Sequence, residues 1–519
     1  MLATKHTVPE WEKVLHDIEL LIKKGQPVDQ IILQKPISVL DDLPYYLKPC
    51  FLYLGLFPKG SKIEVEHLYF LWMAEGTISR NECQNNETMM DLAERYLTDL
   101  VEKKLVEVEE DKTLSLRHCK SCRVHDYIHD HLSRKSDEYF FRVLDFGLRT
   151  PGRTDSDNPA RRMALHLGKQ DDRFLVDQFR NEKANHLRSL LLLSPQDLQV
   201  KWPQGMFDLK KYRILRVLSF DRIDFHGRGL PRGITKLIYL RYLSFKGSRL
   251  EVLPSSIGNL SFLEILDLRV SHRIIIPNVL RKLVKLVYLY LPLEFQMTNN
   301  VKLYLGSLKE LEILENFDTT VCNVADLFEM MRLRHLSTTV EGILWDLEQI
   351  VHRMDITSEN TSVLFTSIKV KNFDCYTEER HSAFRKLLKC QILHTLYMDG
   401  HLGKIPPYNE ITQSLTEMVL IGSQLKEDPM TTLGKLPELR VLVLQNNAFD
   451  GKKMICVESG FKKLKRLELS NLSFLEKWVV KEKSMPVLSI LIVKNCRKLK
   501  TLPDELSKRD LQITFENDN

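Results

Sequence analysis

Residues 439–449, LRVLVLQNNAF, decide the fold. Leucines alternate with variable residues at the start of this stretch, which is typical of a short strand with one face in a core. Asn447 follows at a position where its side chain can turn inward and bond the backbone of a return loop. Residues 240–254, LRYLSFKGSRLEVLP, keep the same order, as do residues 488–503, LSILIVKNCRKLKTLP, in which Cys496 replaces the asparagine. The three stretches therefore predict copies of one strand-plus-return unit.

The motif L-x-x-L-x-L, or a close variant of it, recurs along the C-terminal two-thirds of the chain. Its copies begin at Leu215, Leu240, Leu263, Leu286, Leu311, Leu333, Leu393, Leu415, Leu439, Leu464 and Leu488. Most successive starts lie about 22–25 residues apart, within the range of leucine-rich repeats. No unit can bury its apolar edge alone, so the units are expected to stack into a solenoid. Residues 338–362 depart from the motif and are expected to be helical, and LRSLLLL near Leu187 is expected to form the first strand or its cap.

Length and composition favour a soluble protein with several domains. The chain has 519 residues, and 75 Lys and Arg against 69 Asp and Glu leave a net charge of only +6, which does not force binding to nucleic acid. The nine cysteines are mostly isolated and are expected to be reduced thiols in the core. The start of the sequence lacks the apolar segment of a secretory signal. No apolar run approaches the roughly 20 residues that span a bilayer. We therefore expect a cytoplasmic protein without an integral membrane segment.

The front third predicts helices followed by a small hairpin. Residues 40–58, LDDLPYYLKPCFLYLGLFP, predict an apolar helix that ends at Pro58. Residues 64–78, EVEHLYFLWMAEGTI, predict a second helix that ends at Gly76. Residues 88–132 add a third helix, two strands and a fourth helix. This order indicates a winged-helix domain.

Three ordered segments carry a resemblance to a known family. LDDLPYYLKPCFLYLGLFP, LWMAEGTI and RVHDYIHD resemble the second half of the nucleotide-binding region of plant NLR disease-resistance proteins of the coiled-coil (non-TIR) class. Residues 2–18 resemble the helical subdomain that precedes the winged helix in that family. The resemblance implies an α+β fold joined to a solenoid. Its expected parts are a remnant of the helical NB-ARC subdomain at 1–36, a winged helix at 37–135, a linker and repeat-entry segment at 136–185, and leucine-rich repeats at 186–519. Within the third part, residues 160–167, ARRMALHL, resemble the short strand that opens the repeat domain in that family.

The stretch CRVHDYIHDHL, residues 122–132, allows four interpretations from its side chains. Cys119 and Cys122 with two histidines could bind zinc, although the spacing leaves almost no finger between the ligand pairs. Catalysis by a His–Asp pair would need a nucleophile, and no nearby residue supplies one. The third interpretation is purely structural: the stretch begins a helix, and Asp126 lies favourably at the positive end of the helix dipole. The fourth interpretation follows from the resemblance: Val124, His125 and Asp126 correspond to the family's Met-His-Asp motif, whose histidine lies against the phosphates of bound ADP.

The sequence contains no G-x-x-x-x-G-K-[ST] anywhere, so it lacks the phosphate-cradling loop of a nucleotide site. We therefore expect no cofactor in this chain, although ADP and ATP belong to the full-length family that it resembles. We also expect a fragment of a longer protein or a natural short protein, with no catalytic residues, no metal and no enzymatic activity.

The variable positions of the strand motif are expected to face the concave side of the solenoid. The predicted partner-binding residues at or beside these positions are Arg216, Arg241, Tyr242, Asp267, Tyr288, Tyr290, Arg440, Lys465 and Arg466. Because Tyr and Arg are enriched in interface hot spots, this basic and aromatic stripe predicts contact with an acidic protein surface, either a partner's or that of the chain's own winged helix. Glu64, Glu66 and Glu75 on the second helix disfavour reading DNA and favour packing on a neighbouring domain.

The resemblance implies a regulatory and recognition protein of plant immunity. Its expected partners are a pathogen effector, a guarded host protein or the receptor's own NB-ARC region, and the repeats are expected to take part in autoinhibition. Two alternatives come from other classes: a leucine-rich substrate adaptor of a ubiquitin ligase, and part of a longer switch protein that binds ADP and ATP.

Overall fold

The computed structural model describes residues 43–84, 87–110, 120–134, 140–145, 159–168, 186–195, 199–202, 209–225, 227, 229–231, 233–358 and 365–516. These residues form two compact units, the first ending at Ile274 and the second beginning at Ile275. The predicted subdomain remnant at 1–36, Cys119 and most of the predicted linker at 136–185 lie outside the described residues.

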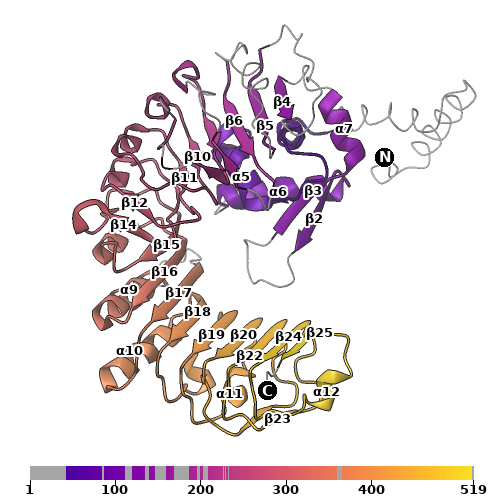
Figure 1. Ribbon diagram of the computed structural model, residues 1–519, viewed down its shortest axis with the longest axis vertical. Helices are drawn as coiled ribbons and strands as arrows, with labels where there is room; N and C mark the ends of the chain where they lie inside the picture. The colour runs from indigo at the N-terminus through magenta and orange to yellow at the C-terminus, as the bar shows by residue number, and fades with distance from the viewer. Residues whose placement is uncertain are drawn as a thin grey trace, which may run out of the picture. The chain divides into compact units, whose positions relative to one another are not determined.

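The first unit begins with the predicted winged helix (Figure 1). Its elements are α4 (Leu47–Tyr53), η2 (Leu54–Leu56), β1 (Ile63–Glu64), α5 (Val65–Glu75), η3 (Arg80–Glu82), α6 (Met89–Glu102), β2 (Val106–Glu110), β3 (Lys120–Val124) and α7 (Asp126–Arg134). The strands form an antiparallel sheet in the order β1-β3-β2. Thr88 and Asp91 form a capping box at the start of α6, which satisfies two of its free backbone donors. Gly76 ends α5 in the left-handed conformation at φ 87°.

A parallel sheet follows in the same unit. Its strands are β4 (Phe141–Asp145), β5 (Arg162–His166), β6 (Ser189–Leu193), β8 (Val217–Ser219), β10 (Tyr242–Ser244) and β11 (Ile265–Asp267), which pair in sequence order. The return segments contain η4 (Leu209–Lys211), η5 (Ile234–Lys236), η6 (Ser255–Asn259), β7 (Val200–Lys201) and β9 (Ile223–Asp224). Strand β5 lies within residues 160–167, where an opening strand is expected, and the sheet begins one strand earlier, at Phe141.

Regular leucine and phenylalanine positions build the core of this sheet. Phe220 and Phe245 occupy the last position of the motif in neighbouring repeats, and their rings stack at 5.6 Å. Phe225 and Trp202 pack against the same ladder. Each fully buried ring of this kind contributes roughly 1.5–3 kcal/mol relative to exposure. The strand motif thus determines which side chains of each strand point into the core, and it also places the stacked phenylalanine rings there.

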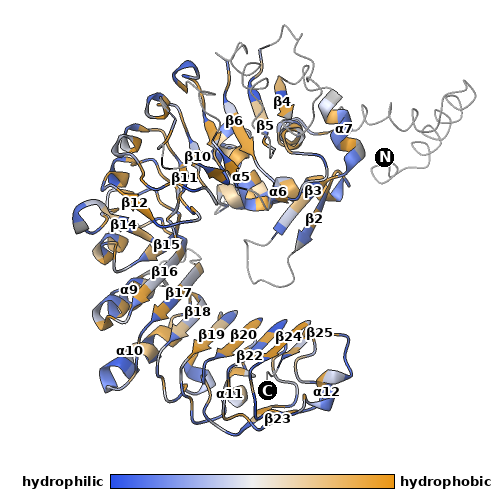
Figure 2. Cartoon of the chain, in the orientation of Figure 1, coloured by the Kyte–Doolittle hydropathy of each residue, from blue (hydrophilic) through white to orange (hydrophobic). Residues whose placement is uncertain are grey.

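The second unit continues the repeats with longer strands. It contains β13 (Tyr288–Tyr290), β15 (Ile313–Asp318), β16 (His335–Glu341), β17 (Phe365–Lys371), β18 (Leu393–Asp399), β19 (Glu417–Ile421), β20 (Val441–Gln445), β22 (Arg466–Ser470), β24 (Ile490–Lys494) and β25 (Gln512–Glu516). These strands are parallel neighbours in this order. In Figure 2 the strands of the repeats are mostly hydrophobic and the connecting loops mostly hydrophilic, as the alternating pattern requires.

Shorter elements complete the return segments. The helices are α9 (Leu344–Ser358), α10 (Glu378–Lys389), α11 (Met430–Leu433) and α12 (Asp504–Ser507). The remaining pieces are η7 (Leu280–Lys282), η8 (Thr298–Asn300), η9 (Val324–Glu329), η10 (Tyr408–Glu410), β12 (Ile274–Ile276), β14 (Phe295–Met297), β21 (Lys453–Cys456) and β23 (Lys477–Val480). The predicted helix within 338–362 exists as α9, but residues 338–341 belong to strand β16.

The inward asparagine and cysteine positions make the expected backbone contacts. The Asn447 side-chain oxygen accepts a hydrogen bond of 2.9 Å from the backbone N–H of Ser473 in the next return segment. The Cys496 thiol contacts the carbonyl of Leu469 at 3.6 Å. Asn447 also has a positive φ of 54°, which asparagine tolerates better than most residues. These side chains link each repeat to its neighbour.

Candidate functional site

Helix α5 lies against the repeat strands of its own unit. Ten of its eleven residues are buried, and its apolar side chains point in all directions around the helix axis. A helix that is hydrophobic all round is a buried helix. It packs near β8 and β10, so the winged helix and the first repeats share a continuous interface within the first unit. The acidic side chains of α5 and of the residue before it meet basic side chains there.

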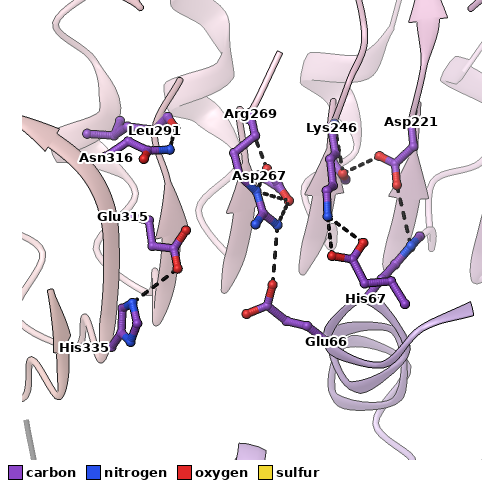
Figure 3. A network of polar contacts seen from close by, with 12 residues as sticks. Glu66, His67, Asp221, Lys246, Asp267, Arg269, Leu291, Glu315, Asn316 and His335 are labelled. Atoms are coloured by element: carbon purple, nitrogen blue, oxygen red, sulfur yellow. Dashed lines mark hydrogen bonds and ion pairs between the residues drawn. The ribbon is translucent and has the colours of Figure 1, made fainter. Parts of the chain in front are cut away.

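The N-terminal end of α5 is held by two ion pairs (Figure 3). The Lys246 ammonium lies 2.5 Å from Glu64, which precedes the helix. The Arg269 guanidinium lies 3.5 Å from Glu66 and makes a bidentate contact with Asp267. Glu66 and Asp267 are only 6% and 1% exposed, so Arg269 neutralises two carboxylates that water cannot reach.

The C-terminal end of α5 is held by a second basic group. Arg162 pairs with the Glu75 carboxylate at 3.3 Å, and the Ser189 hydroxyl donates to the other carboxylate oxygen. Arg216 donates a hydrogen bond of 3.0 Å to the backbone carbonyl of Glu75. A guanidinium at this position complements the negative end of the helix dipole. Burial lowers the pKa of Arg216, and the neighbouring Arg241 lowers it further.

Aromatic contacts fill the space between these two ends. The His67 ring stacks on Tyr242, with centroids 5.8 Å apart and an interplanar angle of 22°. His67 Nδ1 lies 3.6 Å from the Asp221 carboxylate, which also accepts a hydrogen bond from the Ser244 hydroxyl. Burial raises the pKa of the Tyr242 hydroxyl well above its ordinary value. The interface is therefore charged at its two ends and aromatic at its centre.

The predicted partner-binding residues of the first unit have specific places in this arrangement. Arg216 and Tyr242 contact α5, and Asp267 is held by the arginine that reaches Glu66. Arg241 pairs with Glu264 of the neighbouring repeat at 3.8 Å. Lys246 and Arg269 stand just after the strand motif, so the motif does not predict their contacts with Glu64 and Glu66.

Two of the predicted residues in the second unit do not offer an exposed surface. Tyr288 and Tyr290 are 2% and 0% exposed. Their partners on β15 are Ile313 and Glu315, and the Tyr288 hydroxyl lies 3.5 Å from the Glu312 carboxylate. The prediction that these rings are available to a partner is wrong for this structure, because a variable position in the motif is not necessarily exposed when its neighbours are large.

A polar and aromatic row continues from there on neighbouring strands. Glu315 accepts a contact of 3.2 Å from the His335 ring, and both side chains are buried (Figure 3). The His335 ring stacks on Phe365 at 4.8 Å, and Phe365 lies 4.7 Å from the His394 ring. These groups join β15, β16, β17 and β18 on the variable face of the sheet.

Arg440, Lys465 and Arg466 lie together at the start of β20 and β22. The backbone N–H of Lys465 donates to the carbonyl of Arg440, and Arg466 pairs with Glu468 at 2.8 Å. Lys465 is exposed and the other two basic residues are half-buried. The structure thus brings these three predicted residues onto one part of the variable face.

Beside this basic group lies a set of apolar residues that the leucine motif does not predict. The strand register aligns β-branched residues on the variable face of β19, β20 and β24, and they are Val419, Ile421, Val441, Val443, Ile490 and Ile492. We call these six residues the aliphatic patch. The intervening leucines point to the core instead, and Leu442 and Leu444 are fully buried. The Arg466–Glu468 ion pair of β22 lies between the valines of β20 and the isoleucines of β24, and Val419, Ile421 and Ile492 are the half-buried members of the patch. Apolar side chains beside such charged groups have the composition of a protein-binding surface. Valine and isoleucine at the variable positions of these three strands are the sequence feature that could have predicted the patch.

The Val-His-Asp motif lies at the start of α7. Val124 is buried in β3, whereas His125 and Asp126 are exposed. The His125 carbonyl accepts the first helical hydrogen bond, 3.0 Å from the N–H of His129. His129 Nε2 lies 2.8 Å from the carbonyl of Phe57, which joins α7 to the first part of the winged helix. The geometry is that of an ordinary helix start whose one exposed imidazole could meet an anion.

The zinc interpretation stays untested, because Cys119 lies outside the residues that the structure describes. They contain no group of three metal-ligating side chains. Cys122 is buried, and burial raises the pKa of its thiol to about 12, which disfavours the thiolate that a metal requires. The described part of the chain likewise contains no helix whose length and apolar character would let it cross a bilayer.

Comparison with known proteins agrees with this architecture. Residues 56–131 match the family described as the winged helix domain of disease resistance proteins, and residues 186–517 match the family described as a leucine-rich repeat region. Probable disease resistance RPP8-like protein 2 of Arabidopsis thaliana is 35% identical over 521 residues, covering 98% of this chain and 54% of that protein. Disease resistance protein RPP8 of the same plant is 35% identical over 534 residues, covering 99% and 55%. The chain spans about half the length of the curated relatives it matches. Among solved structures, the plant peptide hormone receptor RGFR1 in complex with RGF2 has a TM-score of 0.41 and 16% identity, covering 68% of this chain and 62% of that one.

Proposed function

Because the chain belongs to the plant disease resistance proteins that carry a winged-helix domain and leucine-rich repeats, we propose that it is a non-enzymatic recognition and regulation module of plant immunity. In this proposal the winged helix docks on the first repeats, and the variable face of the later repeats binds a partner protein. The partner is a pathogen effector or a host protein that an effector modifies. The module acts in the cytoplasm and has no cofactor of its own.

The observation that carries this proposal is the docking of α5. Burying Glu66 and Glu75 without partners would be strongly unfavourable, and Arg269 and Arg162 stand opposite them. Such matched charges make the contact specific, because removing either partner leaves an uncompensated buried charge. A specific contact between a regulatory domain and the first repeats is what autoinhibition requires.

The aliphatic patch supports the second part of the proposal. Val419, Ile421 and Ile492 are half-buried on a sheet face where a solvated repeat would carry polar side chains. Burial of such residues by a partner is favourable, and the basic group at Arg440 and Lys465 beside them selects an acidic rim. Leucine-rich repeats bind proteins, and this part of the variable face has the chemistry for it.

The test is chemical cross-linking in leaf cells that express the 519-residue chain, with the cross-linked positions mapped by mass spectrometry. We expect partner cross-links on β19, β20, β22 and β24, and we expect the double variant Ile421→Lys and Ile492→Lys, at two half-buried positions, to lose them. The matched control is Val487→Lys, which changes an aliphatic residue that is already 49% exposed elsewhere in the same unit. Partner cross-links that persist in the double variant, or that map outside these strands, would contradict the proposed recognition surface.

The alternative of a ubiquitin-ligase adaptor is not favoured, because the front of the chain matches the winged helix of disease resistance proteins. The alternative of a larger nucleotide switch concerns the longer relatives, and the motif at His125 is the feature of this sequence that points to it. We propose that this chain alone does not hold ADP tightly.

A further inference from the structure

Exposed apolar residues form a row just before the N-terminal ends of three neighbouring strands of the first unit. Val217, Tyr242 and Ile265 pair with one another on β8, β10 and β11. Three residues before each of them stand, in order, Ile214, Tyr239 and Phe262. They are 38%, 50% and 38% exposed, and the Tyr239 and Phe262 rings lie 5.8 Å apart. The register therefore places one large apolar side chain at the same point of three successive repeats.

Basic residues accompany this row. Lys211 and Lys236 stand six residues before the paired positions, at the ends of η4 and η5, and both are exposed. Arg213 and Ile238 stand between the two rows, and Ile238 is 46% exposed. We call these seven residues, Lys211, Arg213, Ile214, Lys236, Ile238, Tyr239 and Phe262, the basic–apolar ridge. Residues 209–214, 233–239 and 255–262 contain no Asp or Glu, so the charge of the ridge has one sign.

The turns that carry the ridge are closely packed. Gly233 begins the η5 turn with φ 93°, and a Cβ atom there would lie only 2.8 Å from the backbone N of Lys210 in the neighbouring repeat. Only glycine allows this approach and this backbone conformation together. The basic and apolar rows are consequently held side by side by the backbone of adjacent repeats.

The ridge is separate from the α5 interface. The contacts to α5 and to Glu64 before it use Arg216, directly before β8, Tyr242 within β10, and Lys246, two residues after β10. The ridge residues stand three to six residues before the paired strand positions, in the turns that lead into the strands, and no contact of theirs with α5 is among the α5 contacts described above. Both surfaces can therefore be occupied at the same time.

The composition of the ridge indicates what covers it. A contiguous set of exposed Ile, Tyr and Phe side chains marks an interaction site. Interfaces with proteins are depleted in lysine, whereas membrane-surface segments combine lysine with aromatic and aliphatic residues. Basic residues are attracted to anionic lipid headgroups, and aromatic rings settle at the headgroup level. We propose that the basic–apolar ridge docks the first repeats on an anionic membrane surface.

The experiment is co-sedimentation of the purified 519-residue chain with vesicles. One set contains only phosphatidylcholine, and the other replaces one lipid in three by phosphatidylserine. We expect binding to the anionic vesicles only, weakened by added salt because screening shortens the reach of the charges. Each basic residue near the surface contributes roughly fivefold in binding, so Lys211→Gln with Lys236→Gln should reduce it by roughly 25-fold. Ile238→Ser with Tyr239→Ser should also reduce it.

The control is Lys462→Gln with Lys481→Gln, which removes the same charge from exposed positions of the second unit. It should bind the anionic vesicles as the unchanged chain does, and equal melting temperatures should show that all variants fold. The proposal is overturned if the chain ignores anionic vesicles, or if the control loses as much binding as the ridge variants. Binding to polyglutamate that depends on the ridge, without binding to vesicles, would overturn it in favour of an acidic protein partner.

Discussion

Arg269 is the residue on which the winged-helix contact depends most directly. It neutralises Asp267 on its own repeat and Glu66 on α5, and both carboxylates are buried. We expect Arg269→Ala to destabilise the first unit by about 3–5 kcal/mol, because two buried negative charges lose their partner. Urea unfolding followed by tryptophan fluorescence measures this change.

Lys246→Ala is the matched control for that prediction. Lys246 and Glu64 form a pair in which each side chain is about a third exposed, so its loss should cost about 1 kcal/mol or less. Equal effects of the two substitutions would contradict the view that burial, rather than the number of ion pairs, makes the α5 contact specific.

The exposed His125 leads to a prediction about ligand binding. One imidazole at a helix start cannot replace the backbone cradle of a phosphate-binding loop, which the sequence lacks. We expect isothermal titration of ADP into the chain to give no heat of binding at micromolar ligand, and His125→Ala to leave the titration unchanged. Tight binding that disappears in the His125→Ala variant would contradict this.

Some individual side-chain contacts could be predicted from the repeat motif, and others could not. Arg216 and Tyr242 were found because the variable positions of the motif face one side of the sheet, and both contact α5. Lys246 and Arg269 follow the strands, and the motif does not predict which way a side chain points outside the strand. Tyr290 occupies a variable position yet is fully buried, because exposure depends on the size of neighbouring side chains and not on alternation alone.

At the scale of elements, His129 joins α7 to Phe57, the residue that follows η2. Its ring donates to the carbonyl of Phe57, and burial lowers the pKa of the imidazole, although the hydrogen bond and Asp130 oppose this shift. Because the folded pKa lies below the unfolded value of about 6.5, the unfolded state binds more protons on acidification. The stabilising contribution is therefore present above that value and is lost as the pH falls below it.

We expect hydrogen exchange in α7 to quicken between pH 7.5 and pH 5.5 by more than the intrinsic change in exchange rate. His129→Gln keeps a side-chain donor but does not titrate, so the extra acceleration should disappear in this variant. Lys59 and His166 also lie near the ring, and their charges act in the same direction as burial. An unchanged acceleration in His129→Gln would assign the effect to another group.

Elements with a strong local pattern were predicted well, and those without it were not. Helix α5 has an apolar run from Leu68 to Ala74 and a Gly76 directly after its last residue, and these features allowed its end to be predicted from the sequence. Strand β17, FTSIKVK, contains no leucine at the motif positions, and it was missed between the copies at Leu333 and Leu393. Its pairing with β16 over seven residues holds it in the sheet despite the missing motif.

At the scale of the whole molecule, most of the fold could be predicted from the repeat period. A strand that recurs about every 22–25 residues with parallel pairing requires a stack of units, and the structure has such a stack in each unit. The pairing between charges of α5 and the repeats could not be predicted, because it joins residues as far apart in sequence as Glu75 and Arg216. The period determines which units are neighbours, but it does not determine what lies on their variable face.

The same architecture predicts how damage to the core spreads. Phe245 is fully buried and stacks on Phe220, so Phe245→Ala should cost about 3–5 kcal/mol through lost burial and the cavity it leaves. Each repeat packs only on its neighbours, so hydrogen exchange should accelerate in β8, β10 and β11 and stay unchanged in β20, β22 and β24. Leu467→Ala, at a fully buried position of β22, should give the reverse distribution. If either substitution accelerated exchange uniformly along the chain, the repeats would unfold as one cooperative block, and nearest-neighbour stacking would not describe their stability.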